Sequence, residues 1–144
     1  KTAFGRGERF KVKDNFFTVA LIKNPSGFTS NIRTFIQDSR PDVVLFVIND
    51  NFADGRDVSW LWDVTFKGMI PAETQLLTSG IRGADMALRL KQDGLKAEFI
   101  PNVHDAILRL TKAQSNNVTI IPTYTALFEV RAELSKYTKV ANIW

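Results

Sequence analysis

Four charged side chains lie close together in one loop of the sequence: Asp50, Asp54, Arg56 and Asp57. They follow directly after residues 43–48, which are apolar at every position, the pattern of a strand buried on both faces. Carboxylates beyond such a strand can take part in catalysis, or they can bind a cation or a partner protein. Residues 50–57, called the acidic loop below, are therefore the first candidate for a functional site.

A purely local role is the alternative for the acidic loop. Asp and Asn side chains often bond to nearby backbone amides, so Asp50 and Asn51 would form side-chain turns. Gly55 would take a positive φ, and Arg56 would pair with a neighbouring aspartate. The residue types allow both interpretations, and the sequence does not tell which acid faces inward.

Two tryptophans, Trp60 and Trp62, follow the acidic loop almost at once. Aromatic side chains of this size either pack in the core or form a rigid wall that faces a partner protein. The sequence leaves both alternatives open for each tryptophan.

Two other polar segments could bind a ligand: residues 23–27 and residues 78–83. The second could hold an anion through backbone N–H groups at a helix start, with Arg82 adding charge, or Ser79 could simply cap that helix. Neither segment has the glycine pattern of a phosphate-binding loop or of a dinucleotide-binding turn. A nucleotide would therefore have its main binding site in another domain.

The composition argues against several kinds of site. There are no cysteines, which excludes a cysteine nucleophile, a disulfide and a thiolate metal site. The one histidine, His104, is expected to be a helix cap or a surface residue.

The net charge of the chain is +4, but Lys11 and Lys13 alternate with apolar residues, as on the solvent-exposed face of a strand. No nucleic-acid partner is therefore expected. No apolar run approaches the roughly 20 residues that span a bilayer, so no transmembrane segment is expected.

The elements that must position these loops alternate between strand and helix. An N-terminal hairpin is expected, with a turn at Asp14 and Asn15. The expected strands are residues 10–13, 16–22, 43–48, 75–78, 97–100 and 118–121, and the expected helices are residues 28–38, 84–92, 103–113 and 126–134. This order predicts one α/β domain over residues 1–144, with a mostly parallel sheet and helices on both faces. Because the chain begins with Lys1 and not with Met, we expect a domain of a longer protein.

Parallel strands bring their carboxyl ends to one edge of a sheet, where backbone donors, helix N-termini and loop side chains converge on ligands. The acidic loop and the segments 23–27 and 78–83 all follow expected strands. We therefore expect these three segments to lie along one edge of the sheet.

Several motifs, spread over essentially the whole chain, are similar to those of one protein family. They are Phe4-Gly5-Arg6 with Glu8, residues 23–28, residues 49–51, residues 53–63 and residues 122–126. Together they resemble the C-terminal domain of MurT, the Mur-ligase-like subunit of lipid II isoglutaminyl synthase. The resemblance implies a Rossmann-like three-layer domain of the Mur ligase C-terminal type.

The resemblance also implies an activity for the complete enzyme. ATP would activate the α-carboxylate of D-glutamate in lipid II as an acyl phosphate, and ammonia would convert it to D-isoglutamine. The ammonia would come from a glutaminase partner, GatD, which uses a cysteine and a histidine. By the resemblance, Asp50 is the aspartate that completes this Cys-His site from the second chain.

The nucleotide contacts implied by the resemblance are secondary ones. Arg6 would approach the phosphates of ATP, and Lys23 and Asn24 would lie near the ribose or adenine. The phosphate loop, the Mg²⁺ site and a zinc-binding cysteine cluster would belong to a central domain outside this chain, so the isolated domain is expected to be inactive. The enzyme would work in the cytoplasm, at the inner face of the membrane that holds lipid II.

A protein of a different class is the alternative. The chain would then be a non-catalytic α/β regulatory or interaction module whose edge acids bind a cation or a partner. The lysine that a receiver-like domain would need after its late strand is absent from the segment that follows residues 118–121.

Overall fold

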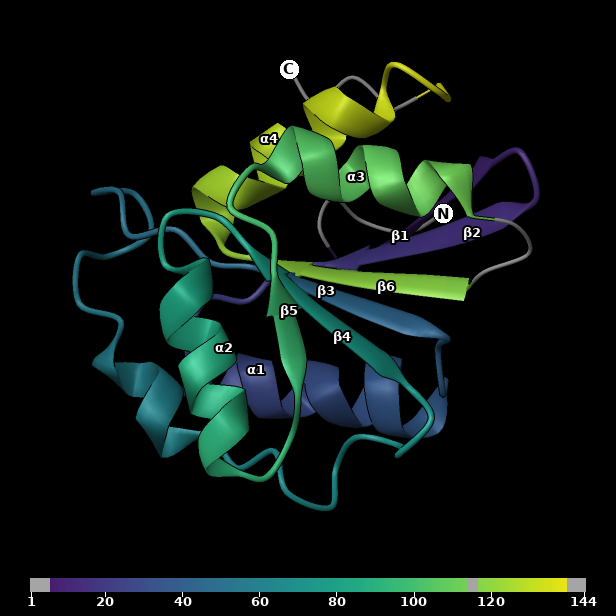
Figure 1. Cartoon of the computed structure of the whole chain (residues 1–144). Helices are drawn as coiled ribbons and strands as arrows, with labels where there is room; N and C mark the ends of the chain where they lie inside the picture. Colours follow the sequence, from purple (N-terminus) through teal and green to yellow (C-terminus); the bar gives the residue numbers. More distant parts are fainter. Residues whose placement is uncertain (1–5, 114–116, 140–144) are drawn as a thin grey trace.

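The computed structural model describes residues 6–113 and 117–139, in which strands and helices alternate (Figure 1). The strands are β1 (Arg6–Val12), β2 (Asn15–Ala20), β3 (Val43–Val47), β4 (Gln75–Ser79), β5 (Ala97–Phe99) and β6 (Asn117–Pro122). The helices are α1 (Pro25–Ile32), α2 (Gly83–Gln92), α3 (Val103–Lys112) and α4 (Tyr124–Leu134), with a π-helical continuation of α1 over Arg33–Asp38 and a 3₁₀ helix over Ser59–Asp63. The expected strands and helices are all present, with small shifts at their ends.

The six strands form one sheet in the order β1-β2-β6-β3-β4-β5. β1 and β2 make the expected antiparallel hairpin, and β2, β6, β3, β4 and β5 run parallel to one another. In the middle of the sheet, Leu45 of β3 pairs with Ile120 of β6 on one side and with Leu77 of β4 on the other. The prediction of an α/β domain with a mostly parallel sheet is thus confirmed.

Helices cover both faces of the sheet, α3 and α4 on one face and α1 and α2 on the other (Figure 1). Successive side chains of β3 point to opposite faces, so this strand contributes to two cores. Leu45 packs in the core under α3 and α4, whereas Phe46 packs in the core under α1 and α2. In that second core, Phe46 meets Phe28 edge to face, with ring centroids 5.8 Å apart. This two-sided burial explains why every position of β3 is apolar.

The turn of the hairpin differs from the prediction in one residue. Asn15 was expected in the turn, but it is the first residue of β2 and is fully buried. Its side-chain amide donates to the backbone carbonyls of Thr111, at 3.4 Å, and Ala113, at 2.8 Å. The turn lies at Lys13 and Asp14, where Lys13 has a φ of 56°. Asn15 therefore bonds to backbone carbonyls at the end of a helix that is distant in sequence, and it does not form the turn beside it.

Helix α1 begins three residues earlier than predicted, because Asn24 and Pro25 start it and do not form a loop. The Asn24 Oδ1 accepts a hydrogen bond from the backbone N–H of Gly27 at 2.8 Å, which satisfies a free donor of the first turn. Pro25 at the first helical position has the φ that the helix needs and lacks an N–H that would go unused. Asn24 is thus the N-cap of α1.

A buried ion pair joins the hairpin to the last helix. Glu8 of β1 is 8% exposed and Arg131 of α4 is 5% exposed, and the two carboxylate oxygens of Glu8 both accept from Arg131 Nη1. A charge at this depth is stable only with its partner, so the pair fixes how α4 lies across β1.

Candidate functional site

Four loops meet at the carboxyl edge of the sheet. The parallel arrangement of β2, β6, β3 and β4 places the loops after β2, β3 and β4 at this edge, as the sequence predicted. The fourth loop is Thr123, between β6 and α4, and it lies between the other loops because β6 pairs with both β2 and β3. Sequence reasoning missed the importance of this loop, since the order of strands in a sheet is not encoded in local patterns.

Asn49 is the central anchor of this edge and is 1% exposed. Its backbone N–H donates to Thr123 Oγ1 at 3.0 Å, and its side-chain Nδ2 donates to Thr125 Oγ1 at 3.1 Å and to Glu129 at 2.7 Å. Its Oδ1 accepts from the backbone N–H of Ile81 at 3.0 Å. One side chain thereby ties the ends of β3, β4 and β6 together, one residue before the acidic loop begins.

Asp54 is the acid of the loop that faces inward. Its Oδ1 accepts from the backbone N–H of Thr125 at 2.6 Å, and its Oδ2 accepts from the Thr125 hydroxyl at 2.5 Å and from the backbone N–H of Asn51 at 3.1 Å. Thr125 lies in the first turn of α4, where backbone donors and the helix dipole favour a negative charge. Asp54 thus caps α4 from a distant loop.

Asp50 is held less tightly than Asp54. Its side chain is 16% exposed and forms an ion pair with Arg82, with 3.3 Å between Asp50 Oδ2 and Arg82 Nε. Arg82 is itself 40% exposed and also pairs with Asp85 at 3.3 Å. Within residues 6–113 and 117–139, this ion pair is the contact that holds the Asp50 carboxylate. Asp50 therefore lies at the edge with capacity to accept hydrogen bonds from another molecule.

The tip of the acidic loop is exposed. Phe52 is 88% exposed, and the Arg56 guanidinium lies 5.4 Å from the centre of its ring. The expected pairing of Arg56 with an aspartate is replaced by this cation–π contact in the described part of the chain. Gly55 has the expected positive φ, 90°. Asp57 accepts from the backbone N–H of Ser59 at 2.8 Å, and this hydrogen bond lowers the pKa of the Asp57 carboxyl.

The two tryptophans have different environments. Trp60 is half-buried and packs edge to face on Phe28, with ring centroids 5.6 Å apart. Trp62 is 50% exposed, and its ring lies 5.4 Å from the guanidinium of the buried Arg89. Arg89 also donates to the carbonyl of Leu61 at 3.0 Å, which fixes the 3₁₀ helix against α2. Trp60 therefore packs against the core as a partly buried residue, and Trp62 lies on the surface.

Ser79 does not cap α2, and two backbone amides of the segment after β4 donate within the chain. Ser79 Oγ is buried and makes no hydrogen bond among the described residues, and the N-cap of α2 is Arg82. The backbone N–H of Ile81 donates to Asn49, and that of Arg82 donates to the carbonyl of Ile48 at 2.8 Å. The capping role expected of Ser79 was therefore wrong. The anion site at the start of α2 stays a prediction, with the Ile81 and Arg82 amides already used by the two residues that follow β3.

Gly80 is required by this close contact between β3 and β4. Its φ is 91°, and a Cβ atom there would lie 2.7 Å from the Ile48 carbonyl oxygen and 2.8 Å from Asn49 Oδ1. We expect Gly80→Ala to lower the free energy of unfolding by at least about 2 kcal/mol, because the strain of a positive φ adds to a backbone collision. Urea unfolding would measure this loss.

Gly94→Ala is the matched control for Gly80→Ala. Gly94 has a φ of 78°, but a Cβ atom there would meet nothing within 4 Å. Its expected cost is only the backbone strain, about 1 kcal/mol. Equal losses for the two variants would contradict a close packing of Gly80 against β3.

The three residues expected near a nucleotide all lie at the carboxyl edge. Arg6 pairs with Ala20 at the end of β2, and Asn24 caps α1 just beyond that strand. Lys23 lines a cleft of about 310 Å³ that is also bordered by Asp54 and by Trp60. The structure therefore brings Arg6, Lys23 and Asn24 to the same edge as the acidic loop.

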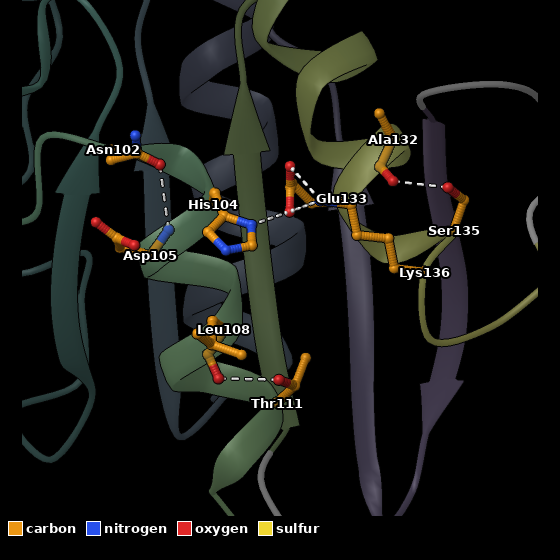
Figure 2. A network of polar contacts seen from close by, with 9 residues as sticks. All are labelled: Asn102, His104, Asp105, Leu108, Thr111, Ala132, Glu133, Ser135 and Lys136. Atoms are coloured by element: carbon orange, nitrogen blue, oxygen red, sulfur yellow. Dashed lines mark hydrogen bonds and ion pairs between the residues drawn. The ribbon is translucent and has the colours of Figure 1, made fainter.

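His104 is a surface residue that links α3 to α4 (Figure 2). Its Nδ1 lies 2.7 Å from Glu133, which also accepts from Lys136 at 3.0 Å. Partial burial raises the pKa of Glu133, but the hydrogen bonds from His104 and Lys136 outweigh it and hold the pKa below its usual value. The cap of α3 is Asn102, which accepts from the backbone N–H of Asp105 at 3.3 Å. Of the two expected roles, the surface role is the one that His104 takes.

The described ranges, 6–113 and 117–139, contain neither a candidate metal site nor a membrane-spanning helix. No group of three or more His, Cys, Asp or Glu side chains is arranged to hold a metal ion. No helix combines the length and the apolar character needed to cross a membrane.

Two solved structures share the fold of this chain. Folylpolyglutamate synthase from Thermotoga maritima superposes with a TM-score of 0.65 at 14% identity, over 93% of this chain and 31% of that one. UDP-N-acetylmuramate–alanine ligase MurC from the same organism superposes with a TM-score of 0.58 at 13% identity, over 92% of this chain and 30% of that one. At these identities the likeness concerns the fold, and it confirms the Mur ligase C-terminal type.

The similarity in sequence identifies the family of this chain. Residues 21–127 match the family described as MurT ligase C-terminal. The lipid II isoglutaminyl synthase (glutamine-hydrolyzing) subunit MurT of Streptococcus pneumoniae is 32% identical over 139 residues, which are 94% of this chain and 31% of that protein. The Staphylococcus aureus subunit of the same name is 28% identical over 135 residues, which are 92% of this chain. The chain thus spans about a third of the length of these relatives, 31% in each case, and it belongs to the MurT ligase C-terminal family.

Proposed function

We propose that this chain is the C-terminal domain of the ligase subunit that amidates the α-carboxylate of D-glutamate in lipid II to D-isoglutamine. The reaction consumes ATP and takes its ammonia from a glutaminase subunit, GatD, at the inner face of the membrane. The names of the MurT relatives, which include lipid II and glutamine hydrolysis, support this assignment.

The observation that carries the proposal is the position of Asp50. It lies at the carboxyl edge directly after the anchored Asn49, and its partner Arg82 is partly exposed. In a Cys-His site, a carboxylate that accepts the imidazole N–H fixes the tautomer and stabilises the imidazolium while the cysteine reacts. Asp50 supplies this carboxylate to the histidine of GatD.

Asp54 and Asp57 are poorer candidates for the same role. Asp54 already accepts three hydrogen bonds, and two of them hold the first turn of α4. Asp57 accepts from Ser59 in a local turn. Their carboxylates act as scaffolding for the loop, whereas the Asp50 carboxylate is free to exchange Arg82 for another partner.

The same contacts argue against the alternative of a cation-binding module. A divalent cation would need several oxygens that converge on one point, and carboxylates carry most of its charge. Here Asp54 points at α4, and Asp50 pairs with Arg82. A magnesium titration followed by NMR would favour the module if it produced strong, localised shifts at Asp50 and Asp54 without GatD.

This domain makes secondary contacts to ATP, whose phosphates and Mg²⁺ are bound by the central domain. The described residues fit a supporting role, because the Ile81 and Arg82 amides after β4 are already used within the chain and Lys23 offers a cation at the edge of a cleft. Asn24 uses its Oδ1 to cap α1, so its NH₂ group is the part that can donate to a nucleotide. Arg6 adds a second cation for the phosphates.

Replacing Lys23 tests the nucleotide contact. In the complete enzyme, we expect Lys23→Ala to raise the KM for ATP several-fold in ligation with ammonium, because one cation near the nucleotide is lost. Glutamine hydrolysis should be unchanged. Lys112→Ala removes the same charge at the C-terminal end of α3 and should leave both activities unchanged. An unchanged KM in Lys23→Ala would remove Lys23 from the nucleotide site.

The function as a whole is tested by reconstitution. The full-length ligase subunit and GatD would be incubated with lipid II and ATP, and amidation would be followed by mass spectrometry with either glutamine or ammonium as the nitrogen source. We expect ATP-dependent amidation of lipid II with both. If neither source yields an amidated product, the assignment fails.

A further inference from the structure

The hydroxyl of Thr125 binds the residues on both sides of Asp50. Its Oγ1 accepts from Asn49 Nδ2 at 3.1 Å and from Asn51 Nδ2 at 3.0 Å. The same oxygen donates to Asp54 Oδ2 at 2.5 Å. A hydroxyl has one proton to donate and two lone pairs to accept with, so these three bonds use its full capacity.

The hydrogen bonds of Thr125 join residues that are far apart in the sequence, so they fix the acidic loop against α4. Asn49 and Asn51 lie 76 and 74 residues before Thr125. Asp54 closes the loop on itself, because its Oδ2 also accepts from the backbone N–H of Asn51 at 3.1 Å. The backbone before, at and after Asp50 is thereby held against the first turn of α4.

We propose that Thr125 is a positioning residue, which fixes the Asp50 carboxylate in the orientation that a partner's imidazole requires. The inference rests on the proposed function of Asp50. Thr125 touches neither glutamine nor the reacting atoms; it acts through the two asparagines that flank Asp50. Because the acidic loop has an exposed tip, the carboxylate needs such an anchor to keep one position.

Two substitutions of Thr125 distinguish the effect of its hydroxyl from the effect of its side-chain shape. Thr125→Val keeps the volume and removes the hydroxyl, so Asn49 and Asn51 lose an acceptor and Asp54 loses a donor. In the assembled complex with GatD, we expect the kcat of glutamine hydrolysis to fall roughly 10-fold to 100-fold, since a small misplacement of a catalytic group costs about this much. Thr125→Ser keeps the hydroxyl and should restore the kcat to within about 3-fold, and the KM for glutamine should change little in either variant.

Combining Thr125→Val with Asp50→Asn distinguishes positioning from general damage. If Thr125 acts through Asp50, the double variant hydrolyses glutamine no more slowly than Asp50→Asn alone, because residues that act as one unit are not additive. A purely structural defect would add its own loss to that of Asp50→Asn. Ligation with ammonium should remain normal in all these variants, which shows that the ligase subunit is folded.

Should Thr125→Val fail to yield a stable protein, Asp54→Asn tests the same anchor. The asparagine keeps one acceptor oxygen for α4 but loses the negative charge. We therefore expect the kcat of glutamine hydrolysis to fall less than in Thr125→Val, with normal ligation of ammonium.

The outcomes keep the two proposals apart. A normal rate of hydrolysis in Asp50→Asn overturns the proposed role of Asp50. A severe loss in Asp50→Asn together with a normal kcat in Thr125→Val overturns the positioning role of Thr125 alone. Equal losses in Thr125→Ser and Thr125→Val would also overturn it, because the hydroxyl would then make no difference.

Discussion

Asp50→Asn in the complete ligase–glutaminase complex should reduce the kcat of glutamine hydrolysis on the order of 10⁴-fold, the loss that follows when a triad aspartate becomes an amide. Asparagine has nearly the same shape, so the loop and its bonds through Asn49 and Asn51 are retained. What changes is the charge opposite the imidazole: an amide can donate to the ring and stabilise the wrong tautomer. Release of glutamate from glutamine would measure the effect.

The same Asp50→Asn complex should amidate lipid II normally when ammonium chloride replaces glutamine, because the proposed function assigns the ligase chemistry to a domain outside this chain. Asp57→Asn is the matched control, since Asp57 lies in the same loop but is exposed and accepts a hydrogen bond from Ser59. We expect it to leave hydrolysis within a few-fold of the parent. If Asp50→Asn behaves like Asp57→Asn, Asp50 does not complete the Cys-His site.

The ion pair with Arg82 compensates the Asp50 carboxylate for its partial burial. A carboxylate at 16% exposure that lacked a positive neighbour would lose favourable solvation without compensation. Arg82 supplies the compensation through a side chain that is 40% exposed and has a second partner in Asp85. In the proposed complex, Arg82 would keep its ion pair with Asp85 if an imidazole took its place at Asp50.

The fold could be predicted from the sequence because its strongest signals are local. An unbroken apolar run marks β3, since both faces of a central parallel strand are buried. The spacing of apolar residues in 103–113 marks α3, whose core side includes Ala106 and Leu110. The errors at Asn15 and Pro25 were also local, as residues that favour turns serve equally well at the end of a strand or the start of a helix.

The site could be predicted only in outline. The acidic loop was found by its charge and its position after β3, but the roles within the loop depend on which strand lies beside β3. That strand is β6, which brings Thr123 and Thr125 next to residues more than 70 positions earlier in the chain. Strand order is a property of the whole fold, so neither the inward direction of Asp54 nor the anchor at Thr125 could be read from the sequence.

The buried pair of Glu8 and Arg131 should have the largest single effect on stability. Glu8→Gln removes the carboxylate charge that faces Arg131, which is 5% exposed, and breaking such a pair costs roughly 3–5 kcal/mol. Because a surface pair is worth at most about 1 kcal/mol, Arg109→Ala, which removes the exposed pair with Glu98, is the control. Urea unfolding followed by tryptophan fluorescence would measure both changes.

Replacing both members of the buried pair separates the attraction between the charges from the cost of burying them. In Glu8→Leu with Arg131→Met, neither charge of the pair remains, and apolar side chains replace both members of the pair. Taking two ions out of water costs about as much as their attraction returns, so the double variant should unfold at a free energy close to that of the parent. It should therefore be more stable than Glu8→Gln by about 3 kcal/mol. If the double variant is no more stable than Glu8→Gln, the attraction between the two charges exceeds the cost of burying them. The ion pair itself would then stabilise the hairpin against α4.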